Sequence, residues 1–117
     1  MACVLIIDDE LDIRQAVAEV LADEGYQVYS AGDGAEGLVQ LRAHHPQIVL
    51  LDLMMPGMSG WEFRKRQQSD PDLSTIPVVV LSALGRDGAI EANGYLQKPF
   101  DLDALLDAVR QHAAHAA

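Results

Sequence analysis

The chain has 117 residues, half of them apolar, and a formal net charge of −10 at pH 7. That length is enough for one domain with a substantial core and too short for two, so we expect residues 1–117 to form a single domain. The acidic balance argues against direct binding to nucleic acid or to an anionic membrane, because both need basic patches on the protein.

The sequence favours a cytoplasmic location. No apolar run approaches the roughly 20 residues that cross a membrane, and the first residues lack the charged and long apolar regions of a signal peptide. The single cysteine, Cys3, cannot form an intramolecular disulfide. Its place at the head of an apolar run predicts a small buried side chain in a reducing compartment.

Short apolar runs alternate with helical patterns along the whole chain. The predicted strands are residues 4–7, 27–30, 48–51, 78–81 and 94–96. The predicted helices are residues 11–24, a segment capped by Asp33 that includes Leu38 and Leu41, residues 61–68, and residues 101–112. This alternation indicates a doubly wound α/β sheet.

Two details of the helices can be tested. In the last helix we expect Leu102, Leu105 and Val109 to face the core. The third helix carries the only basic cluster, Arg64, Lys65 and Arg66, which we expect to be a solvated face.

Four of the five apolar runs lead into polar side chains. Asp8 and Asp9 follow the first run, Asp52 the third and Ser82 the fourth, while Lys98 lies just past the fifth. Because the carboxyl ends of parallel strands meet at one edge of a sheet, these groups should line one crevice. Three carboxylates, a hydroxyl and an amine in one crevice describe a magnesium and phosphoryl site.

Four segments in order resemble the receiver domain of two-component response regulators, and the similarity covers essentially the whole chain. The segments are residues 7–10, 50–60, 81–83 and 95–100. The resemblance implies a flavodoxin-like fold with a five-stranded parallel sheet in which the strands are ordered 2-1-3-4-5. It also implies a phosphorelay function in which phosphorylation switches the conformation of the domain.

The resemblance further assigns the residues of the phosphoryl chemistry. Asp52 is expected to be the phospho-acceptor, and Lys98 to act as a point charge on the bound phosphoryl group. Ser82 would donate a hydrogen bond to that group after moving inward. Tyr95 would change rotamer on activation, so Ser82 and Tyr95 are the expected switch residues. The peptide bond before Pro99 is expected to be cis.

A Mg²⁺ cofactor is implied by the same resemblance. Asp9 and Asp52 would supply carboxylates, Met54 its main-chain carbonyl, and Asp8 would reach the ion through a water. The ligand chemistry agrees, because Mg²⁺ prefers octahedral oxygen ligation and usually keeps several waters.

The segment between Ser82 and Lys98 is shorter than the family resemblance implies. A parallel crossover with its helix needs at least about 10–12 residues, so this connection is near the minimum. Two internal glycines weaken a helix there further. We therefore expect a fourth helix that is shortened or irregular. Many receivers dimerise or bind targets through that helix, so the output mode, a homodimer included, stays open.

Three functions are compatible with this site. We favour a receiver phosphorylated by a sensor histidine kinase or a histidine phosphotransfer protein and acting on a downstream protein or a fused output domain. Such a receiver is not an enzyme beyond its own phosphorylation and dephosphorylation. A magnesium-dependent phosphatase would place a second aspartate two positions after the nucleophile, where this chain has Met54. A phosphorylation-independent binding module would be expected to lack one of the acids or Lys98.

The residues two positions past Asp52 and Ser82 predict a long-lived phosphorylated state. They are Met54 and Leu84, and neither has a polar group to orient an attacking water.

Overall fold

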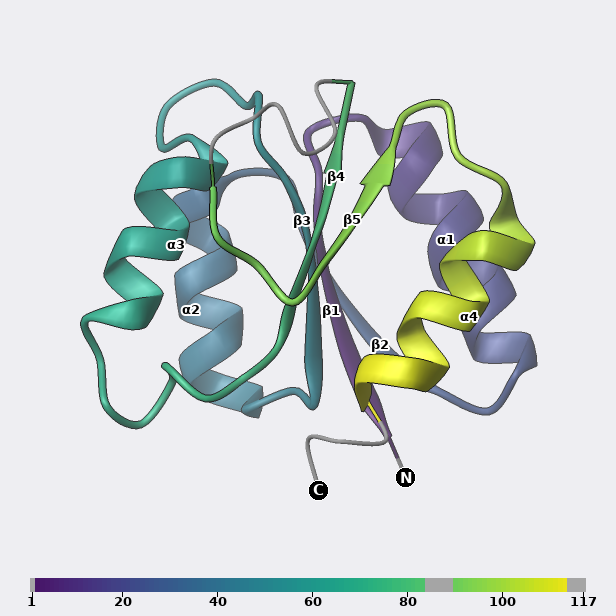
Figure 1. Ribbon diagram of the computed structural model, residues 1–117, viewed down its shortest axis with the longest axis horizontal. Coiled ribbons are helices and arrows are strands. Elements are labelled where there is room, and N and C mark those ends of the chain that lie inside the picture. The colour runs from purple at the N-terminus through teal and green to yellow at the C-terminus, as the bar shows by residue number, and fades with distance from the viewer. Residues whose placement is uncertain (1, 84–89, 114–117) are drawn as a thin grey trace.

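Strands and helices alternate along the computed structural model, which describes residues 2–83 and 90–113 (Figure 1). The strands are β1 (Cys3–Ile7), β2 (Gln27–Ala31), β3 (Ile48–Asp52), β4 (Val78–Ser82) and β5 (Gly94–Gln97). The helices in the described part of the chain are α1 (Leu11–Asp23), α2 (Gly34–His44), α3 (Gly60–Gln68) and α4 (Leu102–Ala113). The five predicted strands and the four helices predicted over 11–24, after Asp33, over 61–68 and over 101–112 are present, and the predicted ends differ from these by a single residue.

The strands form one parallel sheet in the order β2-β1-β3-β4-β5. Helices α1 and α4 cover one face of the sheet, and α2 and α3 cover the other (Figure 1). The predicted flavodoxin-like fold is confirmed. The chain runs outward from β1 to β2 and then crosses back to β3, so the switch point that forms a crevice in such sheets lies between β1 and β3.

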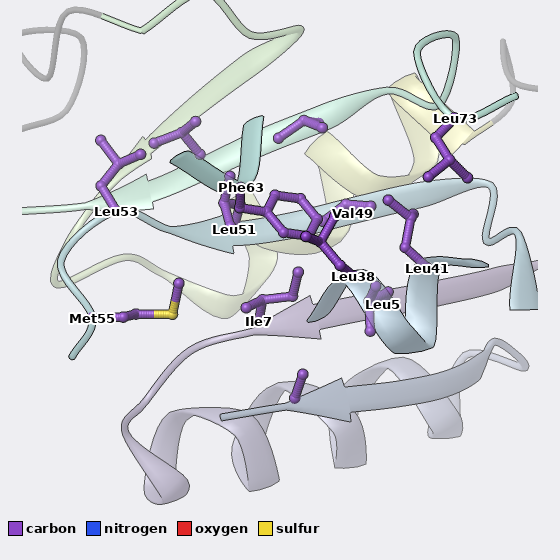
Figure 2. Close-up of a cluster of buried hydrophobic side chains, with 13 residues drawn as sticks. Leu5, Ile7, Leu38, Leu41, Val49, Leu51, Leu53, Met55, Phe63 and Leu73 are labelled. Atoms are coloured by element: carbon purple, nitrogen blue, oxygen red, sulfur yellow. The ribbon is translucent and has the colours of Figure 1, made fainter. Parts of the chain in front are cut away.

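Two apolar clusters fill the spaces between the sheet and its helices. Successive strand residues point to opposite faces, so Val49 and Leu51 of β3 join one cluster while Ile48 and Leu50 join the other. In the first cluster the Phe63 ring of α3 lies beside Val49 and Leu51 (Figure 2). Burial of β3 on both faces holds its last residue, Asp52, in a fixed place.

The loop after Asp52 is fixed by the close approach of α3. The Gly60 amide donates a hydrogen bond to the Leu53 carbonyl at 2.9 Å. A Cβ on Gly60 would lie 2.7 Å from Leu53 Cα, and closer still to the Asp52 carbonyl oxygen, so glycine is required at this position. The Ser59 hydroxyl caps the helix by accepting from the Glu62 amide at 3.3 Å.

Two sequence expectations about the helices are wrong in part. Leu105 and Val109 of α4 are fully buried, but Leu102 is 38% exposed because it is the first residue of the helix and lines a groove beside α1. In the basic cluster of α3, Lys65 and Arg66 are exposed as expected, whereas Arg64 is buried.

The predicted short fourth helix falls on residues 84–89, which lie outside the described residues. The neighbouring residues that are described, Ala83 and 90–93, are not helical. The Lys98–Pro99 peptide is cis, as predicted. None of the helices in the described ranges has the length and apolar character needed to span a bilayer.

Candidate functional site

The polar residues singled out from the sequence gather at one edge of the sheet. Asp52 is the last residue of β3, level with Leu81 of β4, and Ser82 is level with Gln97 of β5. Asp8 follows β1 directly, and its amide continues the strand pairing by donating to the Ala31 carbonyl at 3.1 Å. The predicted convergence is therefore confirmed, since these strand ends lie side by side.

Lys98 bridges three carboxylates at this edge. Its Nζ lies 2.8 Å from Asp8 Oδ2, 3.2 Å from Glu10 Oε1 and 3.7 Å from Asp52 Oδ2. The first two distances are hydrogen bonds, and the third is an ion pair without a hydrogen bond. The backbone of Lys98 is held as well, because its amide donates to the Ser82 carbonyl at 2.9 Å.

Asp8 is fully buried, and its polar groups are bonded on several sides. Besides accepting from Lys98, its carboxylate accepts from the Glu10 amide at 2.9 Å. Its main-chain carbonyl accepts from the Arg14 guanidinium of α1 at 2.6 Å. A buried charge is tolerated only when it is paired and hydrogen-bonded, and Asp8 meets that condition.

The environment of Asp52 opposes its ionisation. Burial, reinforced by the negative charge of Asp8, raises the pKa of Asp52 to about 6. Lys98 and a hydrogen bond from the Met54 amide act in the opposite direction, while a side-chain hydrogen bond with Asp9 raises the pKa further. At neutral pH the Asp52 carboxylate is still mostly ionised, so it is available as a nucleophile.

The carboxylates hold Lys98 in its charged form. Burial alone lowers the pKa of Lys98, but the hydrogen bond and charge of Asp8, together with Asp52 and Glu10, outweigh burial and raise the pKa overall. Lys98 is therefore a fixed positive charge in an otherwise acidic crevice.

The acidic residues offer a set of ligand atoms that suits a divalent cation. One carboxylate oxygen each from Asp8, Asp9 and Glu10 lie within 4.8 Å of one another. Oxygen donors of this kind are what Mg²⁺ and Ca²⁺ require. The residues present therefore fit a hard cation. Glu10 was missed by the sequence reasoning, although its place directly after two aspartates was a signal.

The other expected site residues lie around this cluster. Ser82 is fully buried at the end of β4. Met54 is 62% exposed, and its amide donates to Asp52 Oδ1 at 3.4 Å, a long hydrogen bond.

Tyr95 of β5 is bonded to the segment that precedes its own strand. The Tyr95 hydroxyl donates to the Ile90 carbonyl and accepts from the Ala92 amide at 3.0 Å. Buried Arg64 of α3 holds the same segment by donating to the Glu91 carbonyl at 3.0 Å. The described residues of the short β4–β5 connection are thus tied to both α3 and β5.

The sequence of the chain matches one protein family over most of its length. The sequence model of the response regulator receiver domain matches residues 4–110. The chain belongs to the response regulator receiver family. It is a receiver domain of two-component signalling.

Relatives of similar length carry the receiver domain by itself. The sporulation initiation phosphotransferase F of Bacillus subtilis is 36% identical over 115 residues, which cover 93% of this chain and 91% of the relative. The protein PilH of Pseudomonas aeruginosa is 31% identical, and the match covers 93% of this chain and 95% of PilH. Among solved structures, the chemotaxis protein CheY4 of Vibrio cholerae superposes with a TM-score of 0.88 at 33% identity, covering 96% of this chain and 98% of that one.

Other relatives join a receiver domain to further segments. The match to the response regulator RR06 of Streptococcus pneumoniae is 38% identical and covers 92% of this chain, but 51% of the relative. The chain thus spans about half the length of several relatives that it matches.

Proposed function

We propose that this receiver domain accepts a phosphoryl group on Asp52. The observation that carries the proposal is the position of the Asp52 carboxylate, which is buried at the end of β3 and lies 3.7 Å from the Lys98 ammonium. A phosphoryl transfer needs a positioned nucleophile and positive charge near the phosphoryl oxygens.

In the proposed step an Asp52 carboxylate oxygen attacks the phosphorus of a phosphohistidine. The new O–P bond forms as the N–P bond of the donor breaks, and the histidine leaves with the electron pair of that bond. The Lys98 ammonium, 3.7 Å from Asp52 Oδ2 in the unphosphorylated protein, moves to pair with the phosphoryl oxygens, and Ser82 donates a hydrogen bond to them. The donor is a sensor histidine kinase or a histidine phosphotransfer protein, which places the domain in the cytoplasm.

We further propose that Mg²⁺ is the cofactor. Asp9 and Asp52 would hold it directly with the Met54 carbonyl, and Asp8 through a water. When bound, the ion offsets the repulsion between the anionic nucleophile and the anionic phosphoryl group.

Residues 1–117 would form one receiver domain. A second function, as a phosphatase that turns over many substrate molecules, does not fit the residues of the site. That activity needs an acid two positions after Asp52, and the side chain there is the thioether of Met54. The domain is then not an enzyme beyond its own phosphorylation and dephosphorylation. Its output passes to a downstream protein or a fused output domain.

The test is incubation with acetyl phosphate and Mg²⁺, followed by intact mass. We expect one added phosphoryl group in the wild type and none in Asp52→Asn. The matched control is Asp23→Asn, which removes the same charge at the far end of α1 and should be phosphorylated like the wild type. Phosphorylation of Asp52→Asn, or its absence in the wild type, would exclude the assignment.

A further inference from the structure

In the unphosphorylated protein the Lys98 ammonium is hydrogen-bonded on the β1 side of the crevice, and its movement to a phosphoryl group on Asp52 would be a change of partner. Its two hydrogen bonds go to Asp8 at 2.8 Å and Glu10 at 3.2 Å, while Asp52 lies farther away at 3.7 Å. The Lys98 side chain therefore rests on the β1 side of the crevice in the unphosphorylated protein. Its backbone is fixed by the Ser82 carbonyl, so the change of partner is a movement of the side chain.

Of the two resting contacts, the one to Glu10 is adjustable. Asp8 is fully buried and held by three neighbouring groups, whereas the Glu10 side chain is 58% exposed. The Asp8 carboxylate is fixed by burial and by the bond from the Glu10 amide, whereas the exposed Glu10 carboxylate can turn away into water. The contact with Glu10 is thus the one that can be released without disturbing a buried group.

The Glu10 side chain does not cap α1. It occupies the N-cap position of α1, where a side chain usually accepts from the free amides of the first turn. Its side chain makes no capping hydrogen bond and reaches Lys98 instead. The carboxylate is therefore directed to the crevice and away from the end of its own helix.

We propose that Glu10 is a positioning residue that holds Lys98 in a resting place beside Asp8 and so opposes its movement towards Asp52. The inference rests on the proposed function, since it is the phosphoryl group on Asp52 that draws Lys98 away. Glu10 would then set how readily the domain is phosphorylated, without touching the phosphoryl group itself.

The first experiment compares phosphorylation rates in acetyl phosphate and Mg²⁺ by intact mass. Glu10→Gln keeps the shape of the side chain and removes its charge. An exposed ion pair is worth up to about 1 kcal/mol, so we expect the maximal rate to rise by about two- to fivefold. Asp12→Asn removes an equal charge from the first turn of α1, at a residue outside the three ion pairs of Lys98, and should not reproduce the rise.

A double-mutant cycle separates positioning from other effects of the charge. In a Lys98→Ala background, Glu10→Gln should have no further effect on the rate. If Glu10 instead ligates the metal or repels the phosphodonor, its effect will persist without Lys98. Persistence of that effect, or an equal rise in Asp12→Asn, would overturn the proposal.

A second measurement needs neither metal nor phosphodonor. The chain contains two lysines, Lys65 and Lys98, so a sample labelled with ¹⁵N-lysine gives two Nζ signals. Glu10→Gln should shift the Lys98 signal of metal-free protein and leave that of Lys65 in place, while Asp12→Asn should shift neither. An unmoved Lys98 signal would refute the resting contact. A wild type that is not phosphorylated at all would instead contradict the proposed function.

Discussion

Lys98 and Asp8 are 90 positions apart in the sequence, yet Lys98 Nζ lies 2.8 Å from Asp8 Oδ2. The pair joins the loop after β5 to the end of β1 across the intervening strand ends. The Asp8 side chain is fully buried and that of Lys98 is 14% exposed, so water screens the pair weakly. One contact thus neutralises a buried charge and positions the only ammonium of the crevice among the described residues.

Removing this ammonium should destabilise the fold without abolishing it. In Lys98→Ala the Asp8 carboxylate stays buried and keeps one hydrogen bond, from the Glu10 main-chain amide. We therefore expect a loss of about 1–3 kcal/mol in the free energy of unfolding. Urea unfolding at neutral pH measures it. Lys65→Ala, at an exposed position of α3, is the control and should change stability by less than about 0.5 kcal/mol. Equal losses in the two variants would contradict the buried pair.

The raised pKa of Asp52 predicts a pH-dependent stability in metal-free protein. Folding raises this pKa to about 6 from 3.8, so the folded state binds more protons between these values and loses stability as the pH rises through that window. Asp52→Asn cannot ionise and also loses the attraction of Lys98. We expect it to be more stable than the wild type by about 1–3 kcal/mol near pH 7.5, with the difference vanishing near pH 4.

Thermal unfolding in EDTA across that pH range tests the prediction. The control is Asp23→Asn at an exposed position, whose melting temperature should change with pH in the same way as that of the wild type. A difference between Asp52→Asn and the wild type that stays constant with pH would show that ionisation of Asp52 is not its cause.

Mg²⁺ should stabilise the wild type, because the ion relieves repulsion among Asp8, Asp9 and Asp52. Ligand linkage gives about 1.4 kcal/mol at a tenfold excess of the ion over its dissociation constant. Asp9→Asn removes a proposed ligand and should abolish the rise in melting temperature. Asp23→Asn should keep it. An unchanged response in Asp9→Asn would exclude the ligand assignment.

Tyr95→Phe should loosen the described part of the β4–β5 connection. The variant deletes the hydroxyl that accepts from the Ala92 amide at 3.0 Å. Since such a bond contributes about 0.5–1.5 kcal/mol, exchange of the Ala92 amide hydrogen should quicken by about two- to tenfold. The Ser69 amide, bonded to the Lys65 carbonyl, provides an internal reference. Unchanged exchange at Ala92 would mean that Arg64 alone holds the segment.

The phosphorylated state should be long-lived. Met54, whose amide bonds to Asp52, has an apolar side chain and is 62% exposed. Leu84, the second shielding residue inferred from the sequence, lies outside the described residues. The Met54→Asn/Leu84→Glu variant adds polar groups that can hold an attacking water, so it should lose phosphate several times faster than the wild type. Met54→Leu should leave the lifetime unchanged. A double variant with the wild-type lifetime would disprove the shielding.

The sequence by itself determined the strands and the members of the crevice. Runs such as residues 78–81 are apolar throughout because both faces of a central parallel strand are buried, so the pattern is local and readable. The rule that parallel strands deliver their carboxyl ends to one edge then brings Asp8, Asp52 and Ser82 together without any knowledge of distances.

Only the tertiary structure decided which side chains pair and which are buried. Arg64 looks like a solvated cation beside Lys65 and Arg66, but α3 turns it towards the carbonyl of Glu91, 27 positions away. Glu10 carries no periodic signal, and its pairing with Lys98 depends on how α1 and the β5 loop meet. Leu102 fits the apolar stripe of α4, yet it is exposed at the first position of the helix, where it lines a groove beside α1. Such contacts join distant segments, so no local pattern in the chain encodes them.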